Sequence, residues 1–492
     1  MADQTFEQIN QAVIGGNALV FLHTPEEGRV TSLVRAVAEQ HGRTVTRWSI
    51  LEGLEGDDGD SRDPVTAIKR VETRTEPGFF LFHDLHFHLD NPKVIRALRE
   101  CYQNTRGHGV FIFITSPELV MPEALKKDIM LIVVPPPDEA SILTQVKTIV
   151  DNTPDMTMEA LKSGELVTAL KGLTDNEIGH VLSRALATPG ASFETILTHI
   201  FREKEMIVKK SGYLEYTPPI FKLSDIGGLD NLKEWLSKRK KVFTKEALDA
   251  GVAMPKGLLV MGVSGCGKSL AVKVISSLWN VPIFRLDMNL VFSGLYGNPE
   301  AAFRGALNTI ETVAPAVLWV DEIENSLGME EGGLTISSHI FSAFLTWMQE
   351  KPPMIFIAAT ANKINALPAE VIRKGRFDQV FFCDLPTEIE RKEIINIHLK
   401  RNQADPADFD LGYLAIMTEG WNGAEIETAV SSARIEAFYE DRPFTMADIS
   451  AVCSKIVPLS QTMEEQIKYI RSWAFSRATP ASKYGKMKKK LA

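Results

Sequence analysis

The sequence has few cysteines, no long hydrophobic run and no excess of basic residues, and each absence removes a class of protein. Only four of its 492 residues are cysteine, and none forms a C-x-x-C pair, so neither a zinc site nor a disulfide framework is expected. The N-terminus lacks a basic start followed by an apolar segment, and no stretch reaches membrane-spanning length. The net charge of −9 offers no global field for nucleic acid. These features predict a cytoplasmic globular protein.

The apolar pattern of the chain repeats in its two halves. Each half contains three segments that read as buried strands. They are ALVFL at 18–22, FFLF at 79–82, VFIFI at 110–114, GLLVM at 257–261, AVLWV at 316–320 and MIFIA at 354–358. Helical periodicity between them predicts two successive α/β modules with parallel sheets, each followed by a mainly helical stretch, near 138–210 and 386–456.

The composition suggests where the halves divide. A segment around 208–222 has the Lys, Gly and Pro content of a linker. The predicted parts are an N-terminal α/β domain at 1–210, a linker at 211–222, a second α/β subdomain at 223–385, a helical subdomain at 386–456 and a C-terminal helix with a basic tail at 457–492. The tail, KYGKMKKKLA, is typical of a solvated end, so binding to nucleic acid has no support in the sequence.

A phosphate-binding motif stands between a predicted strand and a predicted helix. Residues 262–269 read GVSGCGKS, which matches G-x-x-x-x-G-K-[ST]. Glycines let such a loop curl so that backbone N–H groups face phosphates. Lys268 would add a positive charge, and the Ser269 hydroxyl would hold Mg²⁺. The residues predicted to contact the nucleotide here are Gly262, Gly265, Cys266, Gly267, Lys268, Ser269 and Leu270.

Two later strands end in polar residues suited to phosphoryl transfer. AVLWVDEIE ends in Asp321 and Glu322. Asp321 could hold the metal's water shell near Ser269, and Glu322 could orient or deprotonate the attacking water. MIFIAATAN ends at Asn362, which is suited to polarise a water or the terminal phosphate. The alternative, an ordinary acidic loop after a strand, is disfavoured by the phosphate loop upstream.

Arg373 and Arg376 follow in LPAEVIRKGRFDQV, beyond the third strand. They cannot easily reach their own site, but in a ring they would face the nucleotide of the next subunit. An arginine supplied in this way can accelerate phosphoryl transfer by about 10³- to 10⁵-fold. The alternative is that both arginines pair with local acids such as Glu370 and Asp378.

Residues 222–456 resemble the AAA family of ATPases. SDIGGLD at 224–230 is similar to the family's adenine-side segment, which implies that Ile226 and Gly227 lie against the base. His398 matches a histidine that family members place near adenine, and GWNGAEI at 420–426 resembles the start of the lid helix. The resemblance implies a P-loop ATPase module of parallel sheet and helical lid, with ATP and Mg²⁺ as cofactors.

Nearly the whole chain resembles a narrower group, the hypothetical-chloroplast-frame AAA proteins of plastids and cyanobacteria. The features that match are FLTWMQEK at 344–351, IRKGRFDQVFFCDLP at 372–386, and a tail containing VPLSQT and RSWAFSRATPAS. This resemblance implies a shared architecture and does not indicate a substrate.

In rings of the family, the segment after the second strand lines the central pore. Here it reads FSGLYGNPE and contains Tyr296, with the usual order of aromatic and apolar residues inverted. Tyr296 is therefore predicted either to grip a polypeptide in the pore or to pack between subunits.

The first module repeats the layout without the chemistry. HTPEEGRV at 23–30 stands where a phosphate loop would be, but it lacks the Gly-Lys-Ser ending. Asp84 stands at the predicted place of the metal-site aspartate, and Leu85 replaces the glutamate that should follow. Residues 1–210 are therefore predicted to be a degenerate AAA-like domain without a phosphate loop. The alternative is an unrelated α/β domain.

These interpretations together predict Mg-dependent ATP hydrolysis by a homo-oligomeric ring, hexameric by resemblance, that remodels a protein or nucleoprotein substrate. The alternative is an ATP-gated assembly switch that presents the N-terminal domain to a partner and turns over slowly. A small-molecule kinase is disfavoured, because arginines acting in trans and a lid of this kind serve no acceptor site.

Overall fold

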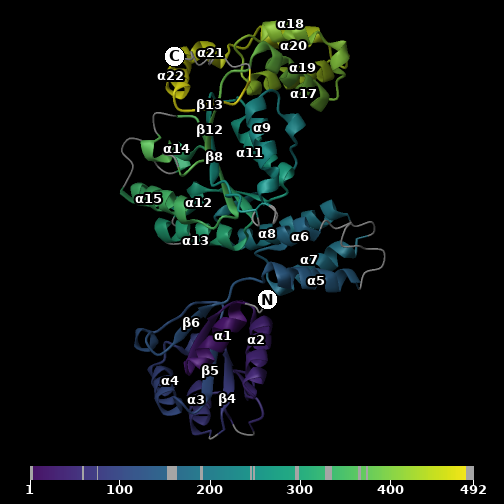
Figure 1. Cartoon of the computed structure of the whole chain (residues 1–492). Helices are drawn as coiled ribbons and strands as arrows, with labels where there is room; N and C mark the ends of the chain where they lie inside the picture. The colour runs from purple at the N-terminus through teal and green to yellow at the C-terminus, as the bar shows by residue number, and fades with distance from the viewer. Residues whose placement is uncertain are drawn as a thin grey trace. The chain divides into compact units, whose positions relative to one another are not determined.

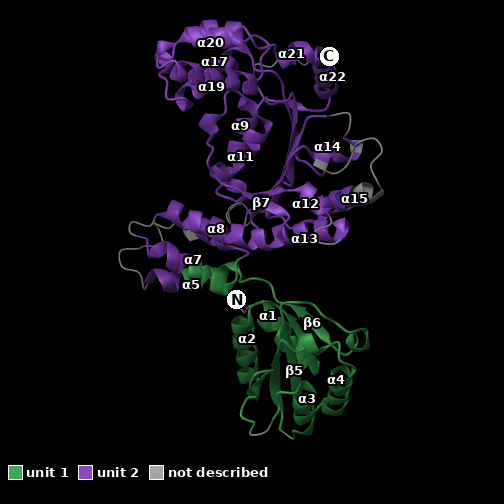
Figure 2. Cartoon of the chain, turned by 180° about the vertical axis from the view of Figure 1, so that it is seen from behind, with its two compact units in different colours: residues 1–146, 173–180 green, residues 147–172, 181–492 purple. Residues whose placement is uncertain are grey.

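The computed structural model describes residues 4–57, 60–74, 76–151, 163–188, 192–243, 247, 250–293, 298–326, 335–363, 367–372 and 375–483. The chain forms two compact units (Figure 2). Unit 1 comprises residues 1–146 and 173–180, and unit 2 comprises residues 147–172 and 181–492. One boundary falls within helix α5 (Glu139–Asp151), one at residues 172 and 173 before helix α7 (Asp175–Leu186), and one within α7. The predicted domain boundary at 211–222 therefore stays a prediction.

Unit 1 is built around a six-stranded sheet in the order β3-β2-β4-β5-β1-β6. All neighbouring strands are parallel except β2 and β3. The strands are β1 (Leu19–His23), β2 (Val45–Ser49), β3 (Gly53–Leu54), β4 (Gly78–His83), β5 (Val110–Ser116) and β6 (Met130–Val133). The helices beside them are α1 (Gln4–Ile14), α2 (Glu27–Gln40), α3 (Pro64–Thr73) and α4 (Pro92–Thr105).

Helices cover both faces of this sheet, and β4 shows how the sequence produces the layers. Its side chains alternate, so Phe79 and Leu81 pack in one core with residues of α1 and α2. Phe80 and Phe82 pack in the opposite core with residues of α3 and α4. A strand buried on both faces reads as a continuous apolar run, which is why FFLF was recognisable from the sequence.

Unit 2 contains a seven-stranded sheet in the order β13-β12-β8-β11-β10-β9-β7, of which Figure 1 labels β8, β12 and β13. All neighbouring strands are parallel except β7 and β9. The strands are β7 (Leu214–Thr217), β8 (Gly257–Gly262), β9 (Ile283–Leu286), β10 (Ala316–Val320), β11 (Ile355–Ala361), β12 (Gln379–Cys383) and β13 (Thr479–Pro480). The helices of this part are α8 (Phe193–Ser211), α9 (Asp230–Arg239), α11 (Lys268–Trp279), α12 (Met288–Phe292), α13 (Pro299–Thr312), α14 (Ile323–Ser326), α15 (Thr335–Glu350) and α16 (Ala369–Ile372).

A helical group follows the sheet of unit 2. It consists of α17 (Glu388–Arg401), α18 (Leu411–Met417), α19 (Gly423–Tyr439) and α20 (Met446–Cys453). These helices share a separate apolar core that includes Leu399, Leu414 and Val430. The chain then forms α21 (Leu459–Thr462) and α22 (Glu464–Phe475) before it returns to the sheet as β13. The helical stretches predicted near 138–210 and 386–456 are confirmed, the first as α5, α6 (Ser163–Leu170), α7 and α8.

The two sheets share one strand order. If the short strand β13 is set aside and the five other strands joined by parallel pairing are numbered along the chain in each sheet, both sheets follow the order 5-1-4-3-2, as β6-β1-β5-β4-β2 and as β12-β8-β11-β10-β9. The predicted repetition of one α/β layout is therefore confirmed. The strands outside the prediction include the short edge strands β3, β7 and β13. Of these, β7 falls within the expected linker and pairs with β9, and β13 extends the opposite edge.

Candidate functional site

The phosphate-loop motif forms the turn that joins β8 to α11, as predicted. Lys268 and Ser269 are the first residues of α11, at the helix N-terminus where backbone N–H groups are free to bind an anion. The Lys268 side chain is buried, and its Nζ donates hydrogen bonds to the carbonyl oxygens of Gly262 (3.1 Å) and Val263 (2.8 Å). Burial lowers the pKa of Lys268, and a bound anion would favour its charged form.

Two of the predicted glycines are required by geometry. Gly262 has a φ of +140°, and a Cβ there would overlap the carbonyl oxygen of Cys383. Gly265 has a φ of +74°, and a Cβ would lie 2.7 Å from Asn422 Oδ1. Because L-residues avoid positive φ, both positions favour glycine. The carbonyl of Gly265 also accepts a hydrogen bond from the N–H of Ala424 (3.1 Å), so the loop contacts the start of α19 directly.

The carboxyl ends of β10 and β11 bring the predicted acidic and amide residues to this loop. Ser269 Oγ donates to Asp321 Oδ1 at 3.2 Å. Asn362 Nδ2 donates to Glu322 Oε1 at 2.6 Å. The residues of these two hydrogen-bonded pairs come from segments far apart in sequence. They meet because β8, β10 and β11 are parallel, so that their carboxyl ends lie at the same edge of the sheet. Oxygen donors such as those of Ser269 and Asp321 are the ligands that Mg²⁺ prefers.

Three residues that the sequence analysis did not identify hold this arrangement together. Thr360 is buried, and its Oγ1 donates to Asp321 Oδ1 (2.6 Å) and accepts from the N–H of Glu322 (2.9 Å). Glu324 Oε1 accepts from the N–H groups of Asn362 (2.7 Å) and Lys363 (2.9 Å). Asn325 Nδ2 donates to Glu322 Oε2 at 2.8 Å. A polar residue inside the apolar strand MIFIAATAN was the available signal for Thr360.

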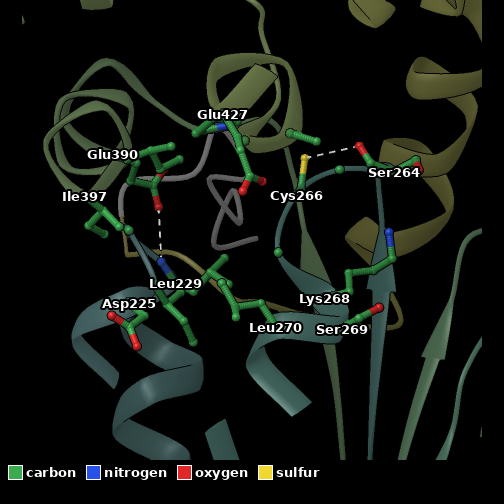
Figure 3. A pocket seen from close by; sticks show the side chains of 18 of the residues that line it. Asp225, Leu229, Ser264, Cys266, Lys268, Ser269, Leu270, Glu390, Ile397 and Glu427 are labelled. Atoms are coloured by element: carbon green, nitrogen blue, oxygen red, sulfur yellow. Dashed lines mark hydrogen bonds between the residues drawn. The ribbon is translucent and has the colours of Figure 1, made fainter. Parts of the chain in front are cut away.

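A cavity of about 320 Å³ adjoins these groups, a volume suited to a small-molecule ligand. Figure 3 shows Lys268 and Ser269 on one side of it and Asp225, Leu229 and Ile397 on the other. Most of the predicted nucleotide-site residues line this cavity. They are Ile226, Gly227, Gly265, Cys266, Gly267, Lys268, Ser269, Leu270, Asp321, Glu322, Asn362 and His398. Gly262 contributes its carbonyl to Lys268 instead.

The end of the cavity away from the phosphate loop is shared with α17 and α19. His398 is buried there, with Nδ1 3.9 Å from Glu427 Oε1. Burial lowers the pKa of His398, which favours the neutral ring. Glu390 Oε1 accepts from the N–H of Leu229 at 3.4 Å (Figure 3), and Glu393 Oε2 accepts from the N–H of Gly228 at 2.8 Å. Two carboxylates of α17 therefore hold the turn that carries Ile226 and Gly227.

Of the predicted arginine and pore residues, the structure describes only Arg376. Arg373 and Tyr296 lie outside the described residues. Arg376 Nη1 donates to the carbonyl oxygen of Glu370 at 2.5 Å, while its Nε is buried without a hydrogen-bond partner in the described part of the chain. Asp378 Oδ2 accepts from the N–H of Gly257 at 2.9 Å.

Cys266 differs from a reactive thiol. Its side chain is buried, and burial raises the pKa of its thiol well above the ordinary range. Because only the thiolate attacks oxidants efficiently, the thiol at this helix N-terminus is protected.

Unit 1 has a different set of residues at the corresponding edge of its sheet. The spacing of the strands predicts Asp84 in the place of Asp321, and the structure corrects this prediction by one residue. His83 Nδ1 lies 3.0 Å from Thr115 Oγ1, matching the bond between Thr360 and Asp321. Asp84, like Glu322, has a positive φ, at 55° and 46° respectively. His83 therefore occupies the place of Asp321, and Asp84 that of Glu322.

Within the described ranges, no group of three or more His, Cys, Asp or Glu side chains is placed to hold a metal ion. Nor does any helix there combine the length and hydropathy needed to cross a bilayer.

The strand order, the phosphate loop at a helix N-terminus and the acidic pair on a neighbouring strand define the AAA class of P-loop proteins. Residues 258–385 match the ATPase family associated with various cellular activities (AAA), and residues 408–451 match the AAA+ lid domain. Residues 5–134 match the N-terminal domain of SpoVK-like AAA ATPases.

Individual relatives show to which group of AAA proteins the chain belongs. The chain is 34% identical to the uncharacterized AAA domain-containing protein ycf46 of Guillardia theta over 93% of this chain and 92% of that protein. It is 33% identical to ycf46 of Trieres chinensis over 93% and 94%. A Cell division cycle protein 48 homolog of Archaeoglobus fulgidus is 30% identical over 51% of this chain and 36% of its own length. The chain belongs to the ycf46 family of AAA proteins, as the sequence analysis predicted.

Proposed function

We propose that this protein hydrolyses ATP in a Mg-dependent reaction, as a cytoplasmic homo-hexameric ring that remodels a protein or nucleoprotein substrate. The observation that carries the proposal is the meeting of Ser269 with Asp321 and of Glu322 with Asn362 beside a single cavity. Family membership supports the ATPase class. The remodelling role is supported by the likeness to the Cdc48 homolog, which covers about half of this chain.

The phosphate end of the cavity supplies binding and charge stabilisation. Lys268 and the N–H groups at the start of α11 would hold the phosphates, because both present positive charge to the same turn. Ser269 and Asp321 would hold Mg²⁺, and the residues fit that ion because both offer oxygen. When bound, Mg²⁺ neutralises charge on the phosphate oxygens. Ile226, Gly227 and His398 would enclose the base.

The reacting end supplies the base and the orienting amide. Glu322 would accept a proton from the attacking water, and Asn362 would orient that water or the terminal phosphate. Arg373 and Arg376 would act on the nucleotide of the neighbouring subunit. Unit 1 would serve as a partner-binding or ring-stabilising tier.

Glu322→Gln and Lys268→Ala test the chemistry. We expect Glu322→Gln to bind ATP with near wild-type affinity while phosphate release falls by at least about 100-fold, because only the base is lost. Lys268→Ala should lose ATP binding itself. Calorimetry that detects no ATP uptake by the wild-type chain would refute the proposal.

The ring is tested by mixing variants. Arg376→Ala subunits retain their own Glu322, and Glu322→Gln subunits retain their own arginines. If the arginine acts in trans, a mixture of the two inactive variants should recover part of the turnover, because some interfaces then combine an intact base with an intact arginine. Turnover that stays at zero in the mixture, with mixed oligomers present on a sizing column, would place the arginine in its own site. Tyr296→Ala tests the pore: unchanged ATPase and remodelling would exclude threading through this residue.

A second candidate function is the ATP-gated assembly switch. It is favoured by the two side-chain amides, of Asn325 and Asn362, that donate hydrogen bonds to Glu322. A catalytic base held in this way would support only slow ATP hydrolysis until these hydrogen bonds break. Turnover that rises strongly with an added protein substrate supports the remodelling enzyme. Slow, unresponsive turnover combined with ATP-dependent assembly supports the switch.

A further inference from the structure

The last described residues of the chain return to the nucleotide cavity from a great distance in sequence. We call residues 479–483 the C-terminal strap. It begins as β13, which pairs with β12 in the register Phe381↔Thr479 and Phe382↔Pro480. The N–H of Ala481 then donates to the carbonyl of Phe382 at 2.9 Å, and Ser482 lines the cavity. The strap therefore extends the sheet at one edge of the cavity.

The strap also supplies a cap that α9 lacks. The residue before α9 is Leu229, whose side chain cannot accept a hydrogen bond, so the first N–H groups of the helix need another partner. The carbonyl of Ala481 accepts from the N–H groups of Asn231 (2.9 Å) and Leu232 (3.2 Å). A backbone carbonyl of the strap thus takes the place of a side-chain cap.

Asn231 holds the strap on both sides of that cap. Its Nδ2 donates to the carbonyls of Pro480 (3.0 Å) and Ser482 (3.1 Å). The Ala481 side chain is fully buried in the same apolar core as Ile226 and Leu229. Since Ile226 and Leu229 line the cavity, any movement of the strap reaches the base side of the site.

A second anchor joins the preceding helix to the end of β12, beside the cavity. Arg471 of α22 contacts Asp384 with Nε at 2.9 Å from each carboxylate oxygen and Nη2 at 2.8 Å from Oδ1. Asp384 follows β12 and lines the cavity. The strap and α22 therefore hold both the start of α9 and the end of β12.

We propose that the C-terminal strap is part of the nucleotide-binding site, with Ser482 in its wall and Asn231 as the positioning residue that keeps it closed. This inference rests on the proposed function, because it assigns the strap to the same ATP site. The ligand is an adenine nucleotide, and the strap acts on its affinity.

The test uses the full chain and a fluorescent N-methylanthraniloyl ADP as probe. Asn231→Ala removes two strap contacts while leaving every predicted phosphate and base residue in place. We expect its dissociation constant for the probe to rise by about 5-fold or more, from the loss of two hydrogen bonds at partly buried positions. The matched control is Ser237→Ala on the exposed side of α9, which should leave the dissociation constant unchanged.

Two truncations separate the strap from the tail beyond it. A chain that ends at Lys483 should bind the probe like the full chain, whereas one that ends at Arg477 should bind it at least as weakly as Asn231→Ala. Adding a peptide of residues 478–483 should restore affinity to the shorter chain, which a general loss of folding would not permit.

The outcomes distinguish the two proposals. If Asn231→Ala keeps a wild-type circular dichroism spectrum and binds the probe within twofold of the wild-type value, the strap is only structural and the inference is overturned. If the full-length wild-type chain fails to bind the probe at all, the proposed function itself fails.

Discussion

The two asparagines that hold Glu322 are predicted to affect kcat in opposite directions when each is replaced by alanine. Asn362 and Asn325 each donate to one oxygen of the Glu322 carboxylate, at 2.6 and 2.8 Å. In the proposed mechanism Asn362 also acts on the water or the phosphate, whereas Asn325 only holds the base. Removing Asn325 should therefore free Glu322 without removing a group that the reaction uses.

The size of the effect follows from the strength of one hydrogen bond. Glu322 and Asn325 are exposed, so the bond stabilises the held carboxylate by about 0.5 to 1.5 kcal/mol net. If release of Glu322 limits turnover, Asn325→Ala should raise kcat by about 2- to 12-fold. Asn362→Ala should lower kcat instead, because it removes the orienting amide as well.

The assay is phosphate release at saturating ATP and Mg²⁺. Glu322→Gln provides the background, and Asn308→Ala provides a control for loss of an exposed helical asparagine, here in α13. A kcat for Asn325→Ala at or below the wild-type value would refute the reasoning, because the held carboxylate would then be the productive one.

Three further predictions concern buried polar groups. Thr360→Val preserves side-chain volume but removes the hydrogen bonds to Asp321 and Glu322. We therefore expect kcat to fall by about 10-fold or more, while the affinity for nucleotide without Mg²⁺, measured by calorimetry, stays unchanged. A kcat equal to that of the wild type would contradict this role of Thr360. Burial raises the pKa of the Cys266 thiol, so the thiol stays protonated at neutral pH. Peroxide should therefore inactivate the wild type and Cys266→Ala at equal rates. Slower inactivation of Cys266→Ala by peroxide would contradict this prediction. Burial lowers the pKa of Lys204 to about 7, and its Nζ has no hydrogen-bond partner among the residues that the structure describes. The unfolded lysine then binds more protons than the folded one between about pH 7 and 10.4, so the unfolding free energy should rise with pH across that window. Lys204→Met should flatten the rise and add about 2 to 4 kcal/mol at pH 7, measured by urea unfolding; a rise that persists in the methionine variant would show that another group causes it.

The buried strands of the two sheets could be predicted from the sequence because burial on both faces leaves a continuous apolar run. The segments at 18–22, 79–82 and 110–114 became β1, β4 and β5, and those at 257–261, 316–320 and 354–358 became β8, β10 and β11. Edge strands gave no such signal. In β13, Thr479 and Pro480 form a strand only because β12 presents a free edge, which depends on tertiary structure.

The site divides in the same way. That Lys268, Ser269, Asp321 and Glu322 meet beside one cavity could be predicted, because the motif spacing places them at the same edge of the sheet. Thr360 and Asn231 were not, because each acts by a hydrogen bond to a partner distant in sequence. The alignment of Asp84 with Asp321 was wrong because spacing along the chain alone does not fix the register of two strands. The error of one residue became visible only from the hydrogen bond between His83 and Thr115.

The two units show that strand order does not by itself confer nucleotide chemistry. Between β1 and α2 the chain has only residues 24–26, whereas between β8 and α11 it has residues 263–267, so the first loop is too short to curl around a phosphate. Its buried Glu26 accepts the N–H of Asp175 at 2.7 Å. That carboxylate thus caps a helix of the same chain, with negative charge at a helix N-terminus as electrostatics favours. In unit 1 the loop after the first strand accepts a backbone N–H group, while in unit 2 the corresponding loop would supply N–H groups to the proposed nucleotide. This reversal accounts for one fold carrying a candidate ATP site in only one of its two copies.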